Sequence, residues 1–150
     1  MDYDKMTEKQ QLALVKLDGN EIEGIENPSE KVQLAAVKEN GCAIQYIQKP
    51  SEQVQLAAAK NDGLSIQYIE NPSEKVQLAA VKQEGFAIDD IENPSLKVKL
   101  AAFQQDPDCL GIAVMENCKI PKHILLKHID HKFRFEIAHK RFLKLIKKSK

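Results

Sequence analysis

Apolar residues recur at helical spacing along the first two thirds of the chain. The segment EKVQLAAVKE shows the pattern most clearly. At 100° per residue, Val32, Ala35 and Ala36 fall on one side of a helix, whereas Leu34 and Val37 fall on the opposite side. A helix at a protein surface has one apolar stripe, so two opposed stripes predict a helix buried between two neighbours. The paired alanines would allow those neighbours to approach closely.

The pattern repeats every 22 residues, and prolines and glycines mark each repeat. Prolines occur at positions 28, 50, 72 and 94, and glycines at positions 19, 41, 63 and 85. The alignment extends back to residue 6, which gives five units that begin at residues 6, 28, 50, 72 and 94. A period of this length is typical of repeat proteins, in which each unit buries apolar residues against its neighbours. We therefore expect an all-α fold, an α-solenoid of five 22-residue units that each contain a long helix and a short one.

The turn between units contains start and stop signals for the long helix. In Asn-Pro-Ser-Glu, Asn27 can cap a helix that has proline at its first position, or Ser29 can be the cap and move the start by two residues. Gly41 and its equivalents are expected to end the helix, because glycine adopts the left-handed C′ conformation without steric cost. The following AIQYI or AIDDI has room for about one and a half helical turns.

The end of the chain differs from the repeats in composition and charge. Residues 1–116 contain 11 lysines and 20 acidic residues, a net charge of −9, whereas residues 117–150 contain 11 basic and two acidic residues, a net charge of +9. We expect a repeat array at 1–116 and a basic helical segment at 117–150. The apolar residues Phe135, Phe142 and Leu145 suit a cap that covers the last unit.

The same segment has an alternative interpretation. A basic amphipathic helix can also bind nucleic acid through its cationic face. The residues named for this interpretation are Arg134, Lys140, Arg141, Lys144, Lys147 and Lys148.

Two copies of the unit, AAVKENGCAIQYI and AAVKQEGFAIDDI, resemble a family of short paired-helix repeats with an AAVKxNGxALQY-like pattern. That family is known from bacterial and viral proteins and has no known function. The likeness covers about residues 7–113, roughly two thirds of the chain, and the PSE turn shortens the unit to 22 residues. The unit is more loosely similar to HEAT-like and leucine-rich-variant repeats. The resemblance implies an α-solenoid and offers no catalytic residues.

The chain carries no recognised motif for catalysis or cofactor binding. It has no GxSxG, P-loop, HExxH or dinucleotide fingerprint, and glycines spaced 22 residues apart cannot form a phosphate-binding loop. We therefore expect no enzymatic activity and no cofactor. Potential metal ligands gather in the C-terminal segment, where their spacing matches no structural zinc pattern and we expect no metal site. They are Cys118, His123, His128, His131 and His139.

Localisation signals are equally sparse. The first residues, MDYDKMTEKQQ, lack the basic and apolar regions of a signal peptide, and no apolar run approaches the roughly 20 residues needed to cross a bilayer. The three cysteines include no CxxC pair and predict reduced thiols. These features favour a cytoplasmic protein without a transmembrane segment.

Lysines of the array occupy two main positions of the unit, seven residues apart. Seven residues make about two helical turns, so both positions lie on one edge of the long helix. The eight lysines of this ladder are Lys9, Lys16, Lys31, Lys38, Lys60, Lys75, Lys82 and Lys97. The ladder is either a solvated edge, paired with glutamates at 8, 30, 52 and 74, or the border of a groove for an acidic partner. The opposite edge carries glutamines at 11, 33, 55 and 77.

The short helices carry a second row of polar and aromatic residues. The second helix of repeat arrays often lines an extended binding surface, and tyrosine is enriched at interfaces. The candidate partner-binding residues are Gln45, Tyr46, Gln67, Tyr68, Asp89 and Asp90. The alternative is that the two tyrosine rings pack between units.

These patterns favour a non-enzymatic module that binds another protein. The viral relatives implied by the resemblance suggest an inhibitor or adaptor encoded by a bacterium or phage. The alternative function is nucleic-acid binding through the basic C-terminal helix.

Overall fold

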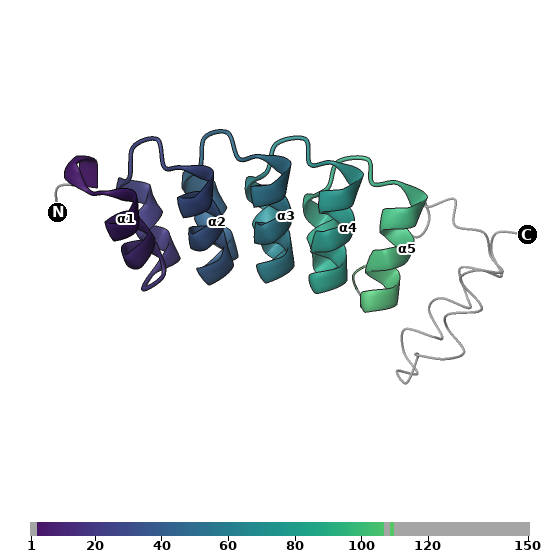
Figure 1. Cartoon of the computed structure of the whole chain (residues 1–150). Helices are drawn as coiled ribbons and strands as arrows, with labels where there is room; N and C mark the ends of the chain where they lie inside the picture. The colour runs from purple at the N-terminus through teal and green to yellow at the C-terminus, as the bar shows by residue number, and fades with distance from the viewer. Residues whose placement is uncertain (1–2, 107–108, 110–150) are drawn as a thin grey trace, which may run out of the picture.

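The described part of the chain is a row of similar helical units. The structure is a computed structural model that describes residues 3–106 and 109. Five long helices lie side by side in chain order, namely α1 (Glu8–Val15), α2 (Glu30–Glu39), α3 (Glu52–Asn61), α4 (Glu74–Gln83) and α5 (Leu96–Gln105) (Figure 1). Short 3-10 helices accompany them, namely η1 (Tyr3–Lys5), η2 (Gly19–Gly24), η3 (Gly41–Tyr46), η4 (Gly63–Tyr68) and η5 (Gly85–Asp90). No strand occurs among the described residues, so the predicted all-α class is confirmed there. The segment 117–150 and its boundary with the array lie outside them.

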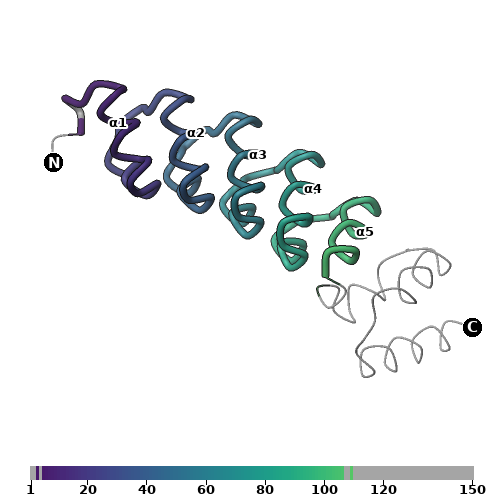
Figure 2. The backbone as a smooth tube through the Cα atoms, turned by 60° about the horizontal axis from the view of Figure 1, so that its bottom comes forward, coloured from purple at the N-terminus to yellow at the C-terminus, as the bar shows by residue number. Residues whose placement is uncertain are grey.

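The helices form two layers, one of long helices and one of short helices. Each long helix contacts the next one along the chain, and η2 to η5 contact one another in the same order. The helices α2, α3 and α4 each contact the short helix of their own unit and that of the preceding unit. Figure 2 shows the same succession of units along one axis. Nearly every contact thus joins residues of one unit or of adjacent units.

The core is made of small and branched side chains that recur in each unit. In α2, Val32, Ala36 and Val37 have no exposed surface, and Ile44 of η3 is buried beneath them. The expectation of two buried stripes is therefore confirmed only in part. Leu34 and Ala35 are half-buried and lie at the outer face of the long-helix layer.

The glutamines predicted on a polar edge lie partly inside the molecule. Gln33 is half-buried, and its side-chain Nε2 donates a hydrogen bond to the carbonyl oxygen of Pro28 at 2.9 Å. The same bond joins Gln55 to Pro50 and Gln77 to Pro72. Because the amide finds a backbone partner in the turn, a polar residue is accommodated on the inward side of the helix.

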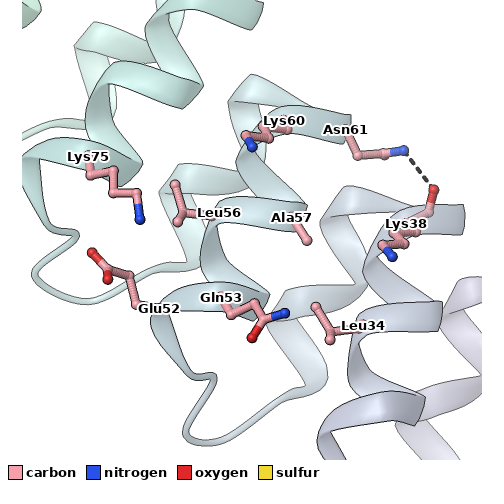
Figure 3. A pocket seen from close by; sticks show the side chains of 9 residues that line it. All are labelled: Leu34, Lys38, Glu52, Gln53, Leu56, Ala57, Lys60, Asn61 and Lys75. Atoms are coloured by element: carbon pink, nitrogen blue, oxygen red, sulfur yellow. Dashed lines mark hydrogen bonds between the residues drawn. The ribbon is translucent and has the colours of Figure 1, made fainter.

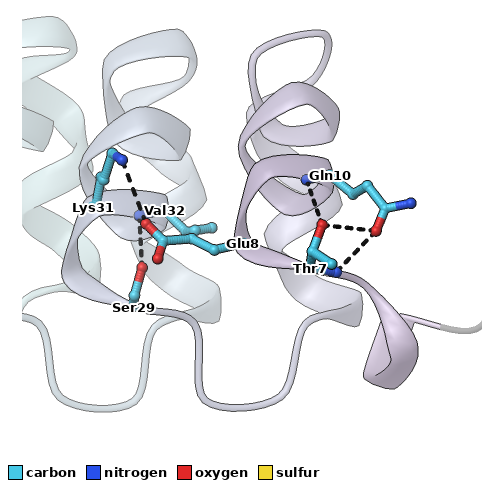
Figure 4. Close-up of polar contacts among 6 residues, drawn as sticks. All are labelled: Thr7, Glu8, Gln10, Ser29, Lys31 and Val32. Atoms are coloured by element: carbon cyan, nitrogen blue, oxygen red, sulfur yellow. Dashed lines mark hydrogen bonds and ion pairs between the residues drawn. The ribbon is translucent and has the colours of Figure 1, made fainter.

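Serine, not asparagine, caps each later long helix. The Ser29 Oγ accepts a hydrogen bond from the Val32 backbone at 3.4 Å, and Thr7 caps α1 with a reciprocal bond to Gln10 (Figure 4). The alternative start two residues later is therefore correct. Asn27 instead adopts a left-handed conformation with φ of 49° in the turn, a conformation that asparagine tolerates better than most residues.

The serine caps also connect successive units. The Ser51 hydroxyl donates to the Glu30 carboxylate of the preceding unit, and the Ser73 hydroxyl donates to Glu52 at 2.6 Å. One hydroxyl thus both caps its own helix and joins it to the helix before.

The glycine after each long helix has a different role from the one expected. No described glycine has a positive φ, and the extended residue Asn40 ends α2 before Gly41 begins η3. Glycine is needed because the next unit lies very close. A Cβ on Gly41 would be 2.9 Å from the carbonyl oxygen of Ala58 and 2.8 Å from the Cβ of Asp62.

The two alanines of α3 provide a matched test of this packing. Ala58 is fully buried, so Ala58→Leu should lower the free energy of unfolding by about 1–3 kcal/mol, because the added atoms have no space between the units. Ala57 is half-buried at the outer face, so Ala57→Leu should change it by less than about 0.5 kcal/mol. Urea unfolding followed by circular dichroism measures both. Equal losses would show that Ala57 is as tightly packed as Ala58.

Close approach at the glycines gives a second prediction. A Cβ on Gly63 would be 2.6 Å from the Ala80 carbonyl oxygen, so Gly63→Ala should lower the free energy of unfolding by about 1–3 kcal/mol. Gly24→Ala is the control, because the three atoms nearest to its Cβ would belong to the side chain of Tyr3 and not to the backbone of the next unit. Thermal and urea unfolding compare the two. A Gly63→Ala chain as stable as the parent would contradict the proposed backbone contact.

Candidate functional site

A groove crosses the outer face of the long-helix layer. It consists of a hollow of about 630 Å³ between α2 and α3 and another of about 640 Å³ between α3 and α4. The two hollows share Leu56, Lys60 and Lys75, so they lie next to each other along the same face. Lys97 of α5 also lines the second hollow. We call these two adjoining hollows together the long-helix groove.

The floor of the groove is apolar. Leu34, Leu56 and Leu78 recur along it at the same position of successive units, and all three are half-buried. Beside each of the first two leucines, the next helix contributes a small side chain, Ala57 or Ala79. Figure 3 shows Leu34 and Ala57 facing the same space between α2 and α3. The hollow exists because a methyl group stands where a larger side chain would fill it.

Cationic side chains border the groove on both sides. The C-terminal margin, named for the helix ends from which it projects, consists of Lys38, Lys60 and Lys82. The N-terminal margin consists of Gln53, Lys75 and Lys97, together with the carboxylates of Glu52 and Glu74. The structure therefore brings five of the eight lysines of the predicted ladder to the border of the groove.

Only part of the ladder is neutralised by glutamate. Lys97 pairs with Glu74 at 3.5 Å, and Lys31, at the equivalent position of α2, pairs with Glu8 at 3.6 Å (Figure 4). The expected pairing is thus present at the N-terminal side of the helices. The Glu30 and Glu52 carboxylates bind the serine caps of the following units.

Amide side chains hold the walls of the groove in place. Asn61 Nδ2 donates to the Lys38 carbonyl oxygen at 2.8 Å (Figure 3), and its Oδ1 accepts from the Gly41 amide at 2.8 Å. Gln105 of α5 forms the same pair of bonds two helices further on, with Gly85 at 2.8 Å and Gln83 at 3.4 Å. Each amide joins the end of its own long helix to the turn of the preceding unit.

The candidate residues on the short helices lie on a different layer from the groove. The described candidates other than Tyr46 are exposed, whereas Tyr46 is half-buried and packs against the core. Tyr68 is 41% exposed. The Gln67 side chain donates to the Leu64 carbonyl oxygen at 3.0 Å. The predicted row is therefore exposed along η3, η4 and η5, except that the Tyr46 ring is partly packed in the core.

Sequence reasoning missed two apolar residues on these short helices. Leu64 is 40% exposed and Phe86 is 42% exposed, at the same position of successive units. The sequence did offer a signal for them, because each directly follows a glycine that recurs every 22 residues. The groove floor was also missed, because its leucines were assigned to a buried stripe.

Other candidates fall outside the described residues. These are the basic residues Arg134, Lys140, Arg141, Lys144, Lys147 and Lys148, and the potential metal ligands from Cys118 to His139. Over residues 3–106 and 109, no group of three metal-ligating side chains occurs. In the same part of the chain, no helix has the length and apolar character needed to cross a membrane.

Comparisons of the chain with models of protein families, with curated proteins and with solved structures found no match. Among the described residues, the long-helix groove combines an apolar floor, a cationic border and, between α2 and α3, walls joined by hydrogen bonds. These properties suit the binding of another molecule.

Cys42 provides a test of local electrostatics. Burial, a hydrogen bond from its Sγ to Asp62 Oδ2 at 3.2 Å, and the Asp62 charge raise the pKa of Cys42 to about 11. The thiolate is the reactive form, so alkylation by iodoacetamide at about pH 8 should be slow and should rise as the pH approaches 11. Asp62→Asn removes the charge and should lower the pKa, which would speed the reaction several-fold at about pH 8.

Mass spectrometry of the tryptic peptide that contains residue 42 gives the rate for this thiol alone. The urea-unfolded chain is the control, because its thiol has an ordinary pKa near 8.5. Equal rates in the folded and unfolded chains at about pH 8 would contradict the raised pKa.

Proposed function

We propose that the chain is a non-enzymatic protein-binding module, built as an α-solenoid of five 22-residue units with residues 117–150 as its basic helical cap. The observation that carries the proposal is the long-helix groove, whose two adjoining hollows are lined by residues of α2, α3, α4 and α5. Extended surfaces that span several units are the usual binding sites of repeat proteins.

The composition of the groove supports a protein partner. Apolar patches bordered by polar residues mark interaction surfaces in soluble proteins. The floor offers partly exposed leucine side chains, and each hollow has space beside an alanine for an apolar side chain of the partner. A partner that fills these hollows would remove leucine surface from water, which provides affinity.

Hydrogen bonds between the helices support the same function. The bonds of Asn61 to Lys38 and Gly41 connect α2 to α3, the walls of the first hollow, and those of Gln105 connect α4 of the second hollow to α5. Binding to walls that are already ordered avoids the entropy loss of arranging them, which favours affinity.

A photo-crosslinking experiment tests the proposal in the full chain. A photoreactive residue at Gln53, at the border of the groove, should form a defined protein adduct in a lysate of the source cells, and mass spectrometry identifies the adduct. The same residue at Gln67, an exposed glutamine of the short-helix layer, is the matched control. Adding Ala57→Leu to the Gln53 chain should abolish the adduct, because leucine fills the hollow without disturbing the core.

Three other outcomes would contradict the proposal or the location of the binding surface in the groove. Adducts from the Gln67 chain alone would move the binding surface to the short helices. Adducts that vanish after nuclease treatment would favour the nucleic-acid alternative. An adduct that survives Ala57→Leu would show that the partner does not occupy the hollow.

A further inference from the structure

We infer that the occupant of the long-helix groove is an acidic peptide in an extended, polyproline-II-like conformation. Its carboxylates lie at the C-terminal margin, with one each at Lys38, Lys60 and Lys82. This inference rests on the proposed function, a protein partner in this groove, and adds the chemistry and conformation of the bound segment.

The charges of the two margins differ, and this difference assigns the carboxylates to one side. At the N-terminal margin, Lys97 is paired with Glu74, and Lys75 is balanced in charge by Glu52, so this margin has no net charge. At the C-terminal margin, the three lysines form no ion pair within the described part of the chain. They lie in the last turns of α2, α3 and α4, where the helix end offsets only about half a unit charge. The C-terminal margin therefore presents one lysine without an ion pair from each of these three helices.

The width of the groove favours an extended chain over a helix. The two margins are seven residues apart along each long helix, a distance of about 10.5 Å. A bound α-helix is itself about 10–12 Å across, so it would rest on the lysine side chains without reaching the leucine floor. An extended chain is narrow enough to lie between the margins.

The spacing of the units sets the repeat of the bound chain. Packed helices lie about 8–10 Å apart. Three residues of a polyproline II helix advance about 9.3 Å, and every third side chain points the same way. One carboxylate can therefore reach each lysine if the peptide has acidic residues at every third position. The intervening positions can supply the apolar side chains for the hollows.

Protein carboxylates fit this surface better than nucleic-acid phosphates. Residues 1–116 contain no arginine, the residue best suited to bidentate phosphate contacts. Glu52 and Glu74 line the same groove and would repel a continuous polyanion. The leucine floor also offers phosphates no partner. A peptide can place its charge at one margin and apolar side chains in the hollows.

Fluorescence anisotropy with defined peptides tests the inference on the full chain. The probe is a labelled peptide of four Glu-Leu-Pro repeats, in which proline favours the extended conformation. A block peptide of the same composition and a neutral peptide of Gln-Leu-Pro repeats are the comparisons. The repeat peptide should bind at least fivefold more tightly than either, and its affinity should fall as salt is raised.

Paired lysine variants localise the contact. K60Q/K82Q should weaken binding of the repeat peptide about fivefold to tenfold, the effect expected from losing two exposed charge contacts. K49Q/K99Q removes the same charge away from the groove and should stay within about twofold of the parent chain. Gln is compatible with position 99, because the equivalent positions in α2, α3 and α4 are already glutamine. Circular dichroism verifies that both variants keep their helices.

Several results would overturn the inference. Equal affinities for the repeat and block peptides would refute the three-residue register. Equal losses of affinity in K60Q/K82Q and K49Q/K99Q would show that binding depends only on the net charge of the chain. Binding of single-stranded oligothymidine that K60Q/K82Q abolishes would assign the margin to phosphates. Self-association that Ala57→Leu abolishes would assign the groove to a second copy of the chain.

The proposed function can survive the failure of this inference. An adduct at Gln53 that Ala57→Leu blocks, together with no peptide binding, would retain a protein partner and reject its acidic, extended form. No adduct and no peptide binding would reject both.

Discussion

The distance between neighbouring units depends on a contact in which the backbone of one unit meets the backbone of the next. A Cβ on Gly41 would be 2.9 Å from the carbonyl oxygen of Ala58, so the two backbone segments approach each other as closely as the absence of a side chain at Gly41 permits. The Gly41 amide donates to Asn61, which donates in turn to the carbonyl oxygen of Lys38. Because these bonds involve the backbone and one short side chain, they leave α2 and α3 little freedom to separate.

The groove is a consequence of this short distance. Valine and alanine side chains such as Val32 and Ala36 fit completely between units, whereas Leu34 of the same helix is only half-buried. The leucines therefore form a row at the outer face, and Leu34 and Leu56 each lie beside an alanine of the following unit. Since the two units repeat this arrangement, hollows that would be minor irregularities on a single helix lie next to each other on one surface. Core packing and the candidate binding surface thus have the same physical origin.

The periodic features of the sequence predicted the unit, and the contacts between units limited what else could be predicted. Prolines and glycines marked the helix ends, and the serine start was one of the two alternatives. Which face of each helix points inward was harder to predict. Gln33 is polar, yet it is half-buried there because its amide donates a hydrogen bond to the carbonyl oxygen of Pro28. The sequence also predicted the lysine ladder as a row. It did not predict which lysines form ion pairs with glutamate, because Glu30 and Glu52 bind serine caps in the folded chain.

Substitutions within the ladder give the groove a direction, which a perfectly repeated surface would lack. At the N-terminal margin, Gln53 takes the place of lysine in α3, and at the C-terminal margin the row ends with Gln104 in α5. A peptide shifted by one unit would therefore meet a different order of charged and neutral side chains. Sliding by one unit toward α5 would also move one carboxylate from Lys82 to Gln104, which loses a charge contact. The identical units set the spacing between equivalent binding positions, and these two glutamines distinguish one position of the peptide along the groove from another.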